Sequence, residues 1–193
     1  MQPVTRVAVT VTFLRMDRPP PDPARPLPAD AALLRLPRPT VAFYRFLYET
    51  VGAPHLWWLR RSLTHEALAG ILADPATSIH VLYRDGEPAG FFELDARGRP
   101  TVNLSYFGLM PHAVGLGLGG AFLRAAIDAA LDSGGRAITV NTCTADHPRA
   151  LPGYLRAGFR PVRTVREVWD VPTRLGLVVP EHLRSVPLAP PLL

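Results

Sequence analysis

Apolar and polar residues alternate along several segments of the chain and recur at helical spacing along others. Alternation rich in valine, threonine and aromatic residues predicts β-strands, and the segments concerned are residues 4–14, 78–83, 87–95, 101–109, 136–143 and 159–171. Apolar positions three and four residues apart predict helices, over residues 40–50, 64–74, 119–132 and 148–157. The order β-α-α-β-β-β-α-β-α-β predicts a mixed α+β sheet, in which a strand–helix–strand unit in the middle supplies a parallel pair.

Capping residues and prolines set the expected ends of these elements. Thr40 and Thr64 are good N-caps, and Asp85-Gly86 is typical of a hairpin turn. Prolines recur through residues 19–39 and forbid a regular helix or a central strand, so we expect either a long wrapped loop or a partly mobile segment there. Residues 172–193 are expected to form a proline-punctuated tail. Because no internal repeat is visible, we expect a single domain over residues 1–193.

Composition narrows the classes of function. All 21 basic residues are arginine, and the formal net charge is +5. The arginines are scattered rather than clustered, which disfavours nucleic-acid binding and is compatible with an anionic cofactor. The single cysteine rules out an internal disulfide, and the histidines show no ligand-like pairing, so we expect a reducing compartment and no metal site. No apolar run approaches the roughly 20 residues that span a bilayer, and the N-terminus lacks the features of a signal peptide. We therefore expect a cytoplasmic protein that does not bind membranes.

A glycine-dense turn is the most informative feature of the sequence. It follows an apolar strand and the stop at Pro111, and four glycines crowd the start of the next helix: Gly115, Gly117, Gly119 and Gly120. Unpaired backbone N–H groups and the positive end of the helix dipole favour a phosphate or pyrophosphate at such a place. The same glycines satisfy the G-x-G-x-x-G dinucleotide pattern. That interpretation fails because the motif lies past the middle of the chain, no acidic residue closes a following strand, and too little chain remains for a Rossmann sheet.

Two motifs resemble the fingerprints of the GCN5-related N-acetyltransferase (GNAT) superfamily. The first comprises Leu109-Met110-Pro111 followed by Val114, Gly117 and Gly119. The second is HPRALPGYLRAGF, which places Ala150, Tyr154, Gly158 and Phe159 at the expected offsets. Val114 stands where the family usually has Gln or Arg, and His147 replaces the usual Asn. The order of the elements also resembles that of the family.

The resemblance implies acetyl-CoA, or another acyl-CoA, as cofactor and a small-molecule or peptide amine as acceptor. It implies direct attack of the amine in a ternary complex, on a fold whose sheet contains a splayed parallel pair. Gly108 is expected to form the bulge that splays this strand, and an N–H near Leu109 to act as an oxyanion hole. The resemblance also allows a homodimer. The residues implied to bind the cofactor are Phe107, Gly108, Leu109, Val114, Gly115, Leu116, Gly117, Leu118, Gly119, Gly120 and His147.

The resemblance implies that Tyr154 is the acid that protonates the departing thiolate, with packing of the last helix as the structural alternative. Asn103 stands where many relatives have a Glu. Glu93, within FFELD, is the best candidate base if burial raises its pKa; it is otherwise a solvated strand residue, with water as a third option. Cys143 is expected to be a small core residue. Trp57-Trp58 with Arg60-Arg61 suggests core tryptophans beside solvated arginines, or an acceptor pocket.

The departures at Asn103, Val114 and His147 support one rival hypothesis. The chain would then be a protein that keeps the acyl-CoA groove of the family but has lost turnover. Because both hypotheses require cofactor binding, only turnover separates them.

Overall fold

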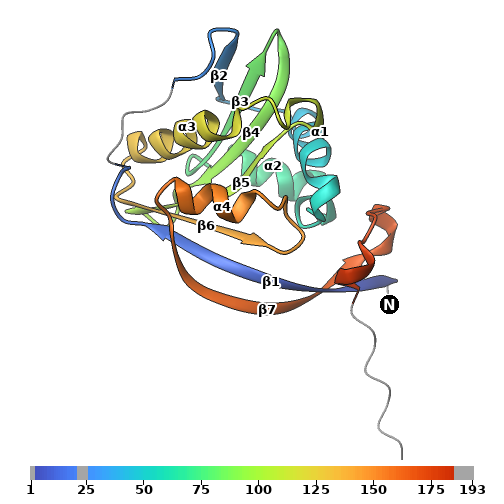
Figure 1. Cartoon of the computed structure of the whole chain (residues 1–193). Helices are drawn as coiled ribbons and strands as arrows, with labels where there is room; N and C mark the ends of the chain where they lie inside the picture. Colours follow the sequence, from blue (N-terminus) through green and yellow to red (C-terminus); the bar gives the residue numbers. More distant parts are fainter. Residues whose placement is uncertain (1–2, 21–25, 185–193) are drawn as a thin grey trace, which may run out of the picture.

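Seven strands form a single sheet in the computed structural model, which describes residues 3–20 and 26–184 (Figure 1). The strands are β1 (Val4–Met16), β2 (Ala31–Leu36), β3 (Thr77–Arg84), β4 (Glu87–Asp95), β5 (Thr101–Leu109), β6 (Ala137–Cys143) and β7 (Arg160–Pro172). Their order across the sheet is β2-β3-β4-β5-β6-β1-β7. Only β5 and β6 run parallel, and the other neighbours are antiparallel. The predicted mixed α+β sheet with one parallel pair is confirmed.

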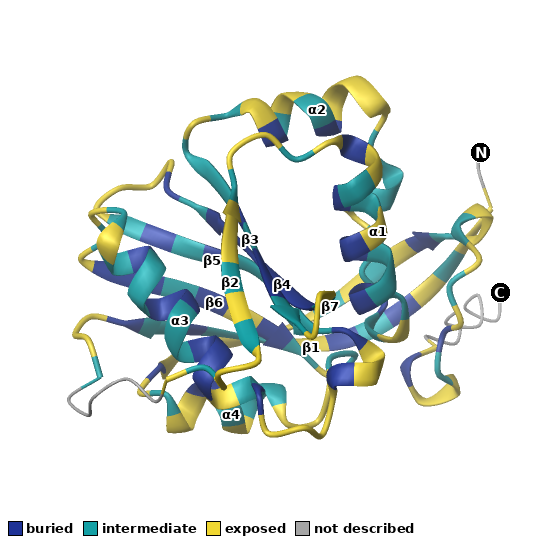
Figure 2. Ribbon diagram, turned by 90° about the horizontal axis from the view of Figure 1, so that it is seen from above, coloured by how far each residue is buried: buried dark blue, intermediate teal, exposed yellow. Residues whose placement is uncertain are grey.

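Four helices cover the two faces of this sheet (Figure 2). They are α1 (Val41–Gly52), α2 (His65–Ala73), α3 (Gly119–Asp132) and α4 (Ala150–Arg156). On one face, Tyr44 of α1 packs edge-on against Phe91 of β4. On the other face, Phe107 of β5 packs against Phe122 of α3 and Tyr154 of α4. The sheet therefore separates an α1/α2 face from an α3/α4 face.

The predicted helix caps are confirmed. The Thr40 hydroxyl accepts a hydrogen bond from the Phe43 N–H at 3.2 Å, and Thr64 accepts one from the Ala67 N–H at 3.2 Å. Each cap satisfies one N–H group that has no partner within its helix. Pro152 falls in the first turn of α4, where a missing N–H removes no helical hydrogen bond.

The proline-rich segment contains a strand that the sequence did not predict. β2 occupies residues 31–36, a stretch without proline between Pro28 and Pro37, and pairs with β3 at one edge of the sheet. Proline excludes a central strand but leaves a short edge strand open, so the expectation of a loop was wrong for these six residues. Residues 21–25 of this segment lie outside the described residues.

Part of the expected tail packs against the sheet. Val179 and Leu183 belong to a hydrophobic cluster with Val7 of β1 and Val171 of β7. Arg184 also forms an antiparallel bridge with Val7. Residues 176–184 therefore cover the end of the β1–β7 pair, while residues 185–193 lie outside the described residues.

The parallel strands β5 and β6 pair over a short stretch and then separate. Their register covers Thr101–Asn103 against Ala137–Thr139, although β5 continues to Leu109 and β6 to Cys143. A hydrogen bond from the Thr139 hydroxyl to Asn103 Oδ1, 3.0 Å long, marks the last paired position. Beyond it, β6 stays paired with β1 and β5 stays paired with β4. The sheet is thus split between β5 and β6 at the carboxyl ends of both strands.

Candidate functional site

The glycine turn before α3 leaves backbone N–H groups open to a ligand. Gly115 and Gly117 have φ values of 89° and 78°, a conformation that side chains disfavour. Leu118, the N-cap of α3, contributes no side-chain hydrogen bond. The first N–H groups of a helix have no partner within the helix, and a Cβ at Gly117 or Gly120 would meet no atom within 4 Å. This bare, positive helix end suits a phosphate or pyrophosphate group.

The carboxyl end of β5 lies beside this helix start. A Cβ added to Gly119 would lie 4.0 Å from Cδ1 of Leu109. Gly108 does not form the predicted bulge: it pairs regularly with Phe91, and the register shift falls at Ser105. Gly108 is required for packing instead, because a Cβ there would lie 2.4 Å from Cγ1 of Val51 in α1.

Tyr154 is buried on the α3/α4 face. Its ring lies 6.4 Å from that of Phe107 and 5.7 Å from that of Phe159, and the residue is 6% exposed. Burial raises the pKa of the Tyr154 hydroxyl, and the charge of Asp146 raises it further. The hydroxyl therefore keeps its proton at neutral pH. His147 lies in the loop before α4, where its Nδ1 accepts a hydrogen bond from the Arg149 N–H at 3.1 Å.

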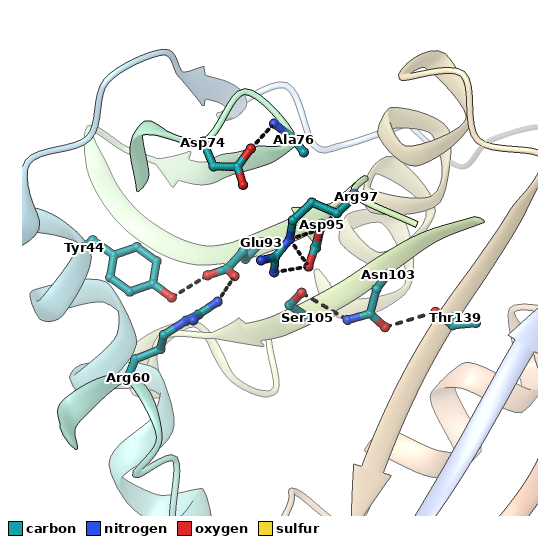
Figure 3. A network of polar contacts seen from close by, with 10 residues as sticks. All are labelled: Tyr44, Arg60, Asp74, Ala76, Glu93, Asp95, Arg97, Asn103, Ser105 and Thr139. Carbon is teal, nitrogen blue, oxygen red and sulfur yellow. Dashed lines mark hydrogen bonds and ion pairs between the residues drawn. The ribbon is translucent and has the colours of Figure 1, made fainter. Parts of the chain in front are cut away.

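Glu93 is fully buried on the α1/α2 face, at 1% exposure (Figure 3). The Tyr44 hydroxyl donates to its Oε2 at 2.5 Å, and an Arg60 Nη2–H donates to its Oε1 at 2.5 Å. Burial acts to lower the pKa of the Arg60 guanidinium, but the charge and hydrogen bond of Glu93, together with Tyr44 and Tyr106, outweigh it and the pKa is raised. The alternative of a solvated Glu93 is therefore wrong. The Glu93 carboxylate therefore connects β4 to Tyr44 of α1 and to Arg60 in the segment that follows α1.

The arginines after α1 are not solvated as expected. The Arg60 side chain is 17% exposed and that of Arg61 is 19% exposed. Arg61 donates to the backbone oxygen of Leu175 at 2.8 Å, which ties this segment to the turn after β7. Arg60 Nε has no hydrogen-bond partner among the described residues.

An aromatic wall surrounds the Glu93–Arg60 pair. Tyr106 of β5 lies 4.8 Å from Tyr48 of α1 and 5.1 Å from Trp57, measured between ring centroids. The Arg60 guanidinium lies 5.4 Å from the Tyr106 centroid, within the range of a cation–π interaction. Because Glu93 pairs directly with Tyr106, both side chains share one face of the sheet. The predicted core position of Trp57 agrees with these contacts.

The two predicted catalytic residues lie on opposite faces of the sheet. Phe92 pairs with Phe107 and faces α3 and α4, whereas Glu93 pairs with Tyr106 and faces α1 and α2. Successive residues of a strand alternate between the faces. Groups from both faces can meet only where the sheet is split, between the unpaired ends of β5 and β6.

Asp146 lies near this split, and sequence reasoning missed it. Its Oδ2 accepts hydrogen bonds from the Thr142 hydroxyl at 2.7 Å and from the Cys143 N–H at 2.9 Å. Trp57 Nε1 donates to Oδ1 at 3.4 Å. An acidic residue three positions after a predicted strand, just before His147-Pro148, was the available signal. Burial, together with the charge of Asp146, raises the pKa of the Cys143 thiol to about 12, so this thiol is not a nucleophile at neutral pH.

One cavity lies away from these residues. It has a volume of about 700 Å³ and lies between β2, the start of α1 and α2, where Arg35, Arg38 and His65 contribute to its lining. None of the predicted site residues borders it. The position of the candidate site therefore rests on the glycine turn and on the split sheet.

Residues 40–159, more than half of the chain, match the acetyltransferase (GNAT) family. The chain therefore belongs to the GNAT family, whose general chemistry is acyl transfer. No curated protein sequence matches the chain. In the part of the chain that the structure describes, no helix is long and apolar enough to cross a membrane.

Solved structures share the fold at low sequence identity. A GCN5-related N-acetyltransferase from Kribbella flavida is 15% identical with a TM-score of 0.60, over 86% of this chain and 60% of that one. Another from Sphaerobacter thermophilus is 18% identical with a TM-score of 0.60, over 89% of this chain and 53% of that one. An aminoglycoside acetyltransferase, meta-AAC0020, from an uncultured soil sample is 13% identical with a TM-score of 0.55, over 67% of this chain and 88% of that one. The chain thus spans little more than half the length of the first two proteins.

Proposed function

We propose that the chain is an N-acyltransferase that transfers an acetyl group from acetyl-CoA to a primary amine in a ternary complex. The observation that carries this proposal is the uncapped start of α3, which lies beside the carboxyl end of β5, where β5 no longer pairs with β6. Membership in the GNAT family supports acyl transfer as the chemistry of this site. Whether the acyl group is acetyl or longer, and which amine accepts it, are questions for experiment.

The proposed binding site for acetyl-CoA follows the glycine turn. The backbone N–H groups of Leu116, Gly117, Leu118, Gly119 and Gly120 would hold the pyrophosphate, since backbone donors need no particular side chain there. Residues 107–109 of β5 would hold the pantetheine arm. His147, in the loop between β6 and α4, is the remaining residue proposed to contact the cofactor. When bound, acetyl-CoA supplies an activated thioester.

In the proposed mechanism a neutral amine attacks the thioester directly. An N–H near Leu109 donates to the carbonyl oxygen as negative charge develops on it. Tyr154 protonates the departing sulfur. Glu93 was the predicted base, but taking up a proton there would break its ion pair with buried Arg60. We therefore propose that Glu93 mainly orients Tyr44 and Arg60 in the wall on the acceptor side.

A binding protein without turnover is the second candidate. Asn103 supports it, because the amide that stands in place of the family Glu is tied to its neighbours and cannot accept a proton. Its Nδ2 donates to the Ser105 hydroxyl at 3.1 Å and its Oδ1 accepts from Thr139 at 3.0 Å. The presence of Tyr154 at the motif position of the family acid supports the enzyme instead.

Thiol release from acetyl-CoA tests both candidates. The purified chain is incubated with acetyl-CoA and a panel of amines, amino acids, aminoglycosides and peptides, and acetyl-CoA binding is measured by calorimetry on the same sample. Release above the rate without acceptor supports the enzyme. Binding without release from any member of a broad panel favours the binding protein, and absence of binding contradicts both. A cytoplasmic location and a single domain remain part of the proposal, as does a homodimer, which sedimentation of the same sample would test.

A further inference from the structure

The carboxylate of Asp146 is held rigidly at the end of β6. The Thr142 hydroxyl and the Cys143 N–H both donate to Oδ2, at 2.7 and 2.9 Å. Thr142 is itself only 5% exposed, so this pair of donors is fixed by the packed strand. Each carboxylate oxygen can accept two hydrogen bonds. Oδ1 receives only the long contact of 3.4 Å from Trp57 Nε1 among the described hydrogen bonds.

Trp57 links Asp146 to the carboxyl end of β5. Its ring packs against Tyr106 at 5.1 Å, and its Cη2 would lie 3.6 Å from a Cβ added to Gly108. A single indole ring therefore separates the Asp146 carboxylate from the Gly108 backbone. His55 also contacts the loop after β6, with its Nδ1 3.3 Å from the Ala145 oxygen. The segment after α1 and the loop after β6 thus meet across the separated ends of the parallel strands.

Asp146 lies within electrostatic range of the proposed acid. After burial, its charge is the next largest cause that raises the pKa of Tyr154 in α4 and that of Cys143 in β6. His55 and His147, whose ring centroids lie 6.2 Å apart, are the further titratable groups on the two segments that meet here. Asp146 is therefore near Tyr154, the proposed acid, and it also contacts Trp57 of the aromatic wall.

The surroundings of Asp146 suit a base better than those of Glu93. Glu93 is 1% exposed and is bound to the guanidinium of Arg60, so protonation would leave a buried cation unpaired. The donors to Asp146 are neutral: a hydroxyl, a backbone N–H and an indole N–H. Asp146 is also partly exposed, so an entering amine can reach it.

On the basis of the proposed function, we infer that Asp146 is the catalytic base and that Glu93 is not. Asp146 takes one proton from the ammonium group of the acceptor: an N–H bond breaks and an O–H bond forms at Oδ1. The freed nitrogen lone pair forms a bond to the acyl carbon as the C–S bond breaks. Tyr154 gives its proton to the sulfur. The second nitrogen proton restores Tyr154 through water, and the proton on Asp146 leaves to solvent.

Asp146→Asn and Glu93→Gln, compared side by side, test this assignment. Asp85→Asn is the matched control, because Asp85 lies in the exposed β3–β4 turn at φ 51°, where asparagine is well tolerated. The measurements are kcat and KM for the best acceptor of the panel between pH 6 and pH 9, and the Kd for acetyl-CoA. We expect kcat/KM of Asp146→Asn to fall about 100-fold near pH 7, with the Kd unchanged. The deficit should shrink as the pH approaches the pKa of the acceptor amine, because the free amine then needs no base.

The remaining outcomes separate this inference from the proposed function. Glu93→Gln should keep the pH profile of the wild type, and Asp146→Glu should regain part of the activity. The inference is overturned if Asp146→Asn stays within about threefold of the wild type at pH 7, or if Glu93→Gln alone shows the deficit that recovers at high pH. If Asp146→Asn fails to fold, failure of the folded Asp146→Glu variant to exceed the rate without enzyme would also overturn it. A wild-type protein that binds no acetyl-CoA would instead overturn the proposed function, and this inference with it.

Discussion

Tyr154 packs in the core and is also the acid of the proposed mechanism. Its ring fills the space between Phe107 and Phe159, while burial and the charge of Asp146 raise the pKa of its hydroxyl. The packing interpretation is confirmed by these contacts, and the acid role remains a proposal for the same residue. A substitution that keeps the ring and removes the hydroxyl separates them.

Tyr154→Phe is expected to lower kcat while leaving the structure and acetyl-CoA affinity nearly unchanged. General acid catalysis contributes about 100-fold or more, and the phenyl ring preserves the contacts with Phe107 and Phe159. Steady-state thiol release gives kcat, calorimetry gives the Kd, and thermal unfolding serves as the structural control. Unchanged turnover would show that the sulfur leaves without help from Tyr154.

His80 provides a test of the packing that is independent of catalysis. Its ring is stacked on Phe92 with centroids 4.5 Å apart, and burial, with a smaller effect of Arg35, lowers its pKa to about 4. An unfolded chain binds this proton near pH 6.5, so the folded state loses stability as the pH falls from about 6.5 to 4. His80→Phe should remove about 1 kcal/mol of that loss, allowing for partial solvent access. Urea unfolding of both proteins at pH 7 and pH 4.5 measures the difference, and equal losses would contradict the assignment.

The sequence predicted single residues better than their partners. The residues around Tyr154 have fixed offsets within one motif, so the tyrosine was found directly. Glu93 was expected among Phe91 and Phe92, but its ion pair with Arg60 joins residues 33 positions apart. Asp146 was not predicted as a site residue, because its contact with Trp57 joins residues 89 positions apart. Contacts of this kind depend on which face each strand turns toward a helix, and local spacing does not contain that information.

At the scale of elements, the start of α3 carries the cofactor hypothesis. Gly119→Asp places a carboxylate among the N–H groups proposed to hold the pyrophosphate. Repulsion between like charges costs several kcal/mol, so we expect acetyl-CoA affinity to fall at least about 100-fold. The helix itself should tolerate the change, because an acidic side chain in the first turn interacts favourably with the helix dipole.

Gly119→Ala is the matched control for this prediction. Its Cβ would lie 4.0 Å from Leu109 Cδ1, an ordinary contact, and it adds no charge. Calorimetry should give a Kd close to that of the wild type for Gly119→Ala and a much weaker one for Gly119→Asp. Equal affinities of the two variants would place the pyrophosphate elsewhere.

Element boundaries followed closely from local signals. Thr40 and Thr64 cap α1 and α2 as predicted, because these hydroxyls satisfy N–H groups within three residues. β2 was not predicted because prolines flank it on both sides. Such a short strand is compatible with nearby prolines only at the edge of a sheet. The bulge in β5 was predicted at Gly108 but lies at Ser105. Glycine is needed at position 108 because Val51 approaches its backbone closely, and the sequence does not show that contact.

At the scale of the whole molecule, the position of β1 in the sheet could not be predicted from the sequence. The strand was predicted, but it lies between β6 and β7 and pairs with residues more than 120 positions away. In this position it joins the main core to the smaller cluster around Val7, Val171 and Leu183. It also holds β6 in the sheet while β6 diverges from β5. The split that the proposed reaction needs is therefore supported by a strand from the far end of the chain.

This arrangement makes thermal stability a reporter of the cofactor. A ligand that contacts α3, β5 and the loop before α4 binds the folded chain alone, so it should stabilise the whole sheet. At a concentration of 100 times Kd the gain is about 2.7 kcal/mol, which raises the Tm by roughly 5–10 °C for a domain of this size. CoA without the acetyl group should produce most of the shift, since the pyrophosphate provides the main charged contact. Gly119→Asp should show none of it, and Asp146→Asn should show all of it, because Asp146 acts on the amine and not on the cofactor. A shift that survives in Gly119→Asp would mean that the ligand stabilises the chain from another surface.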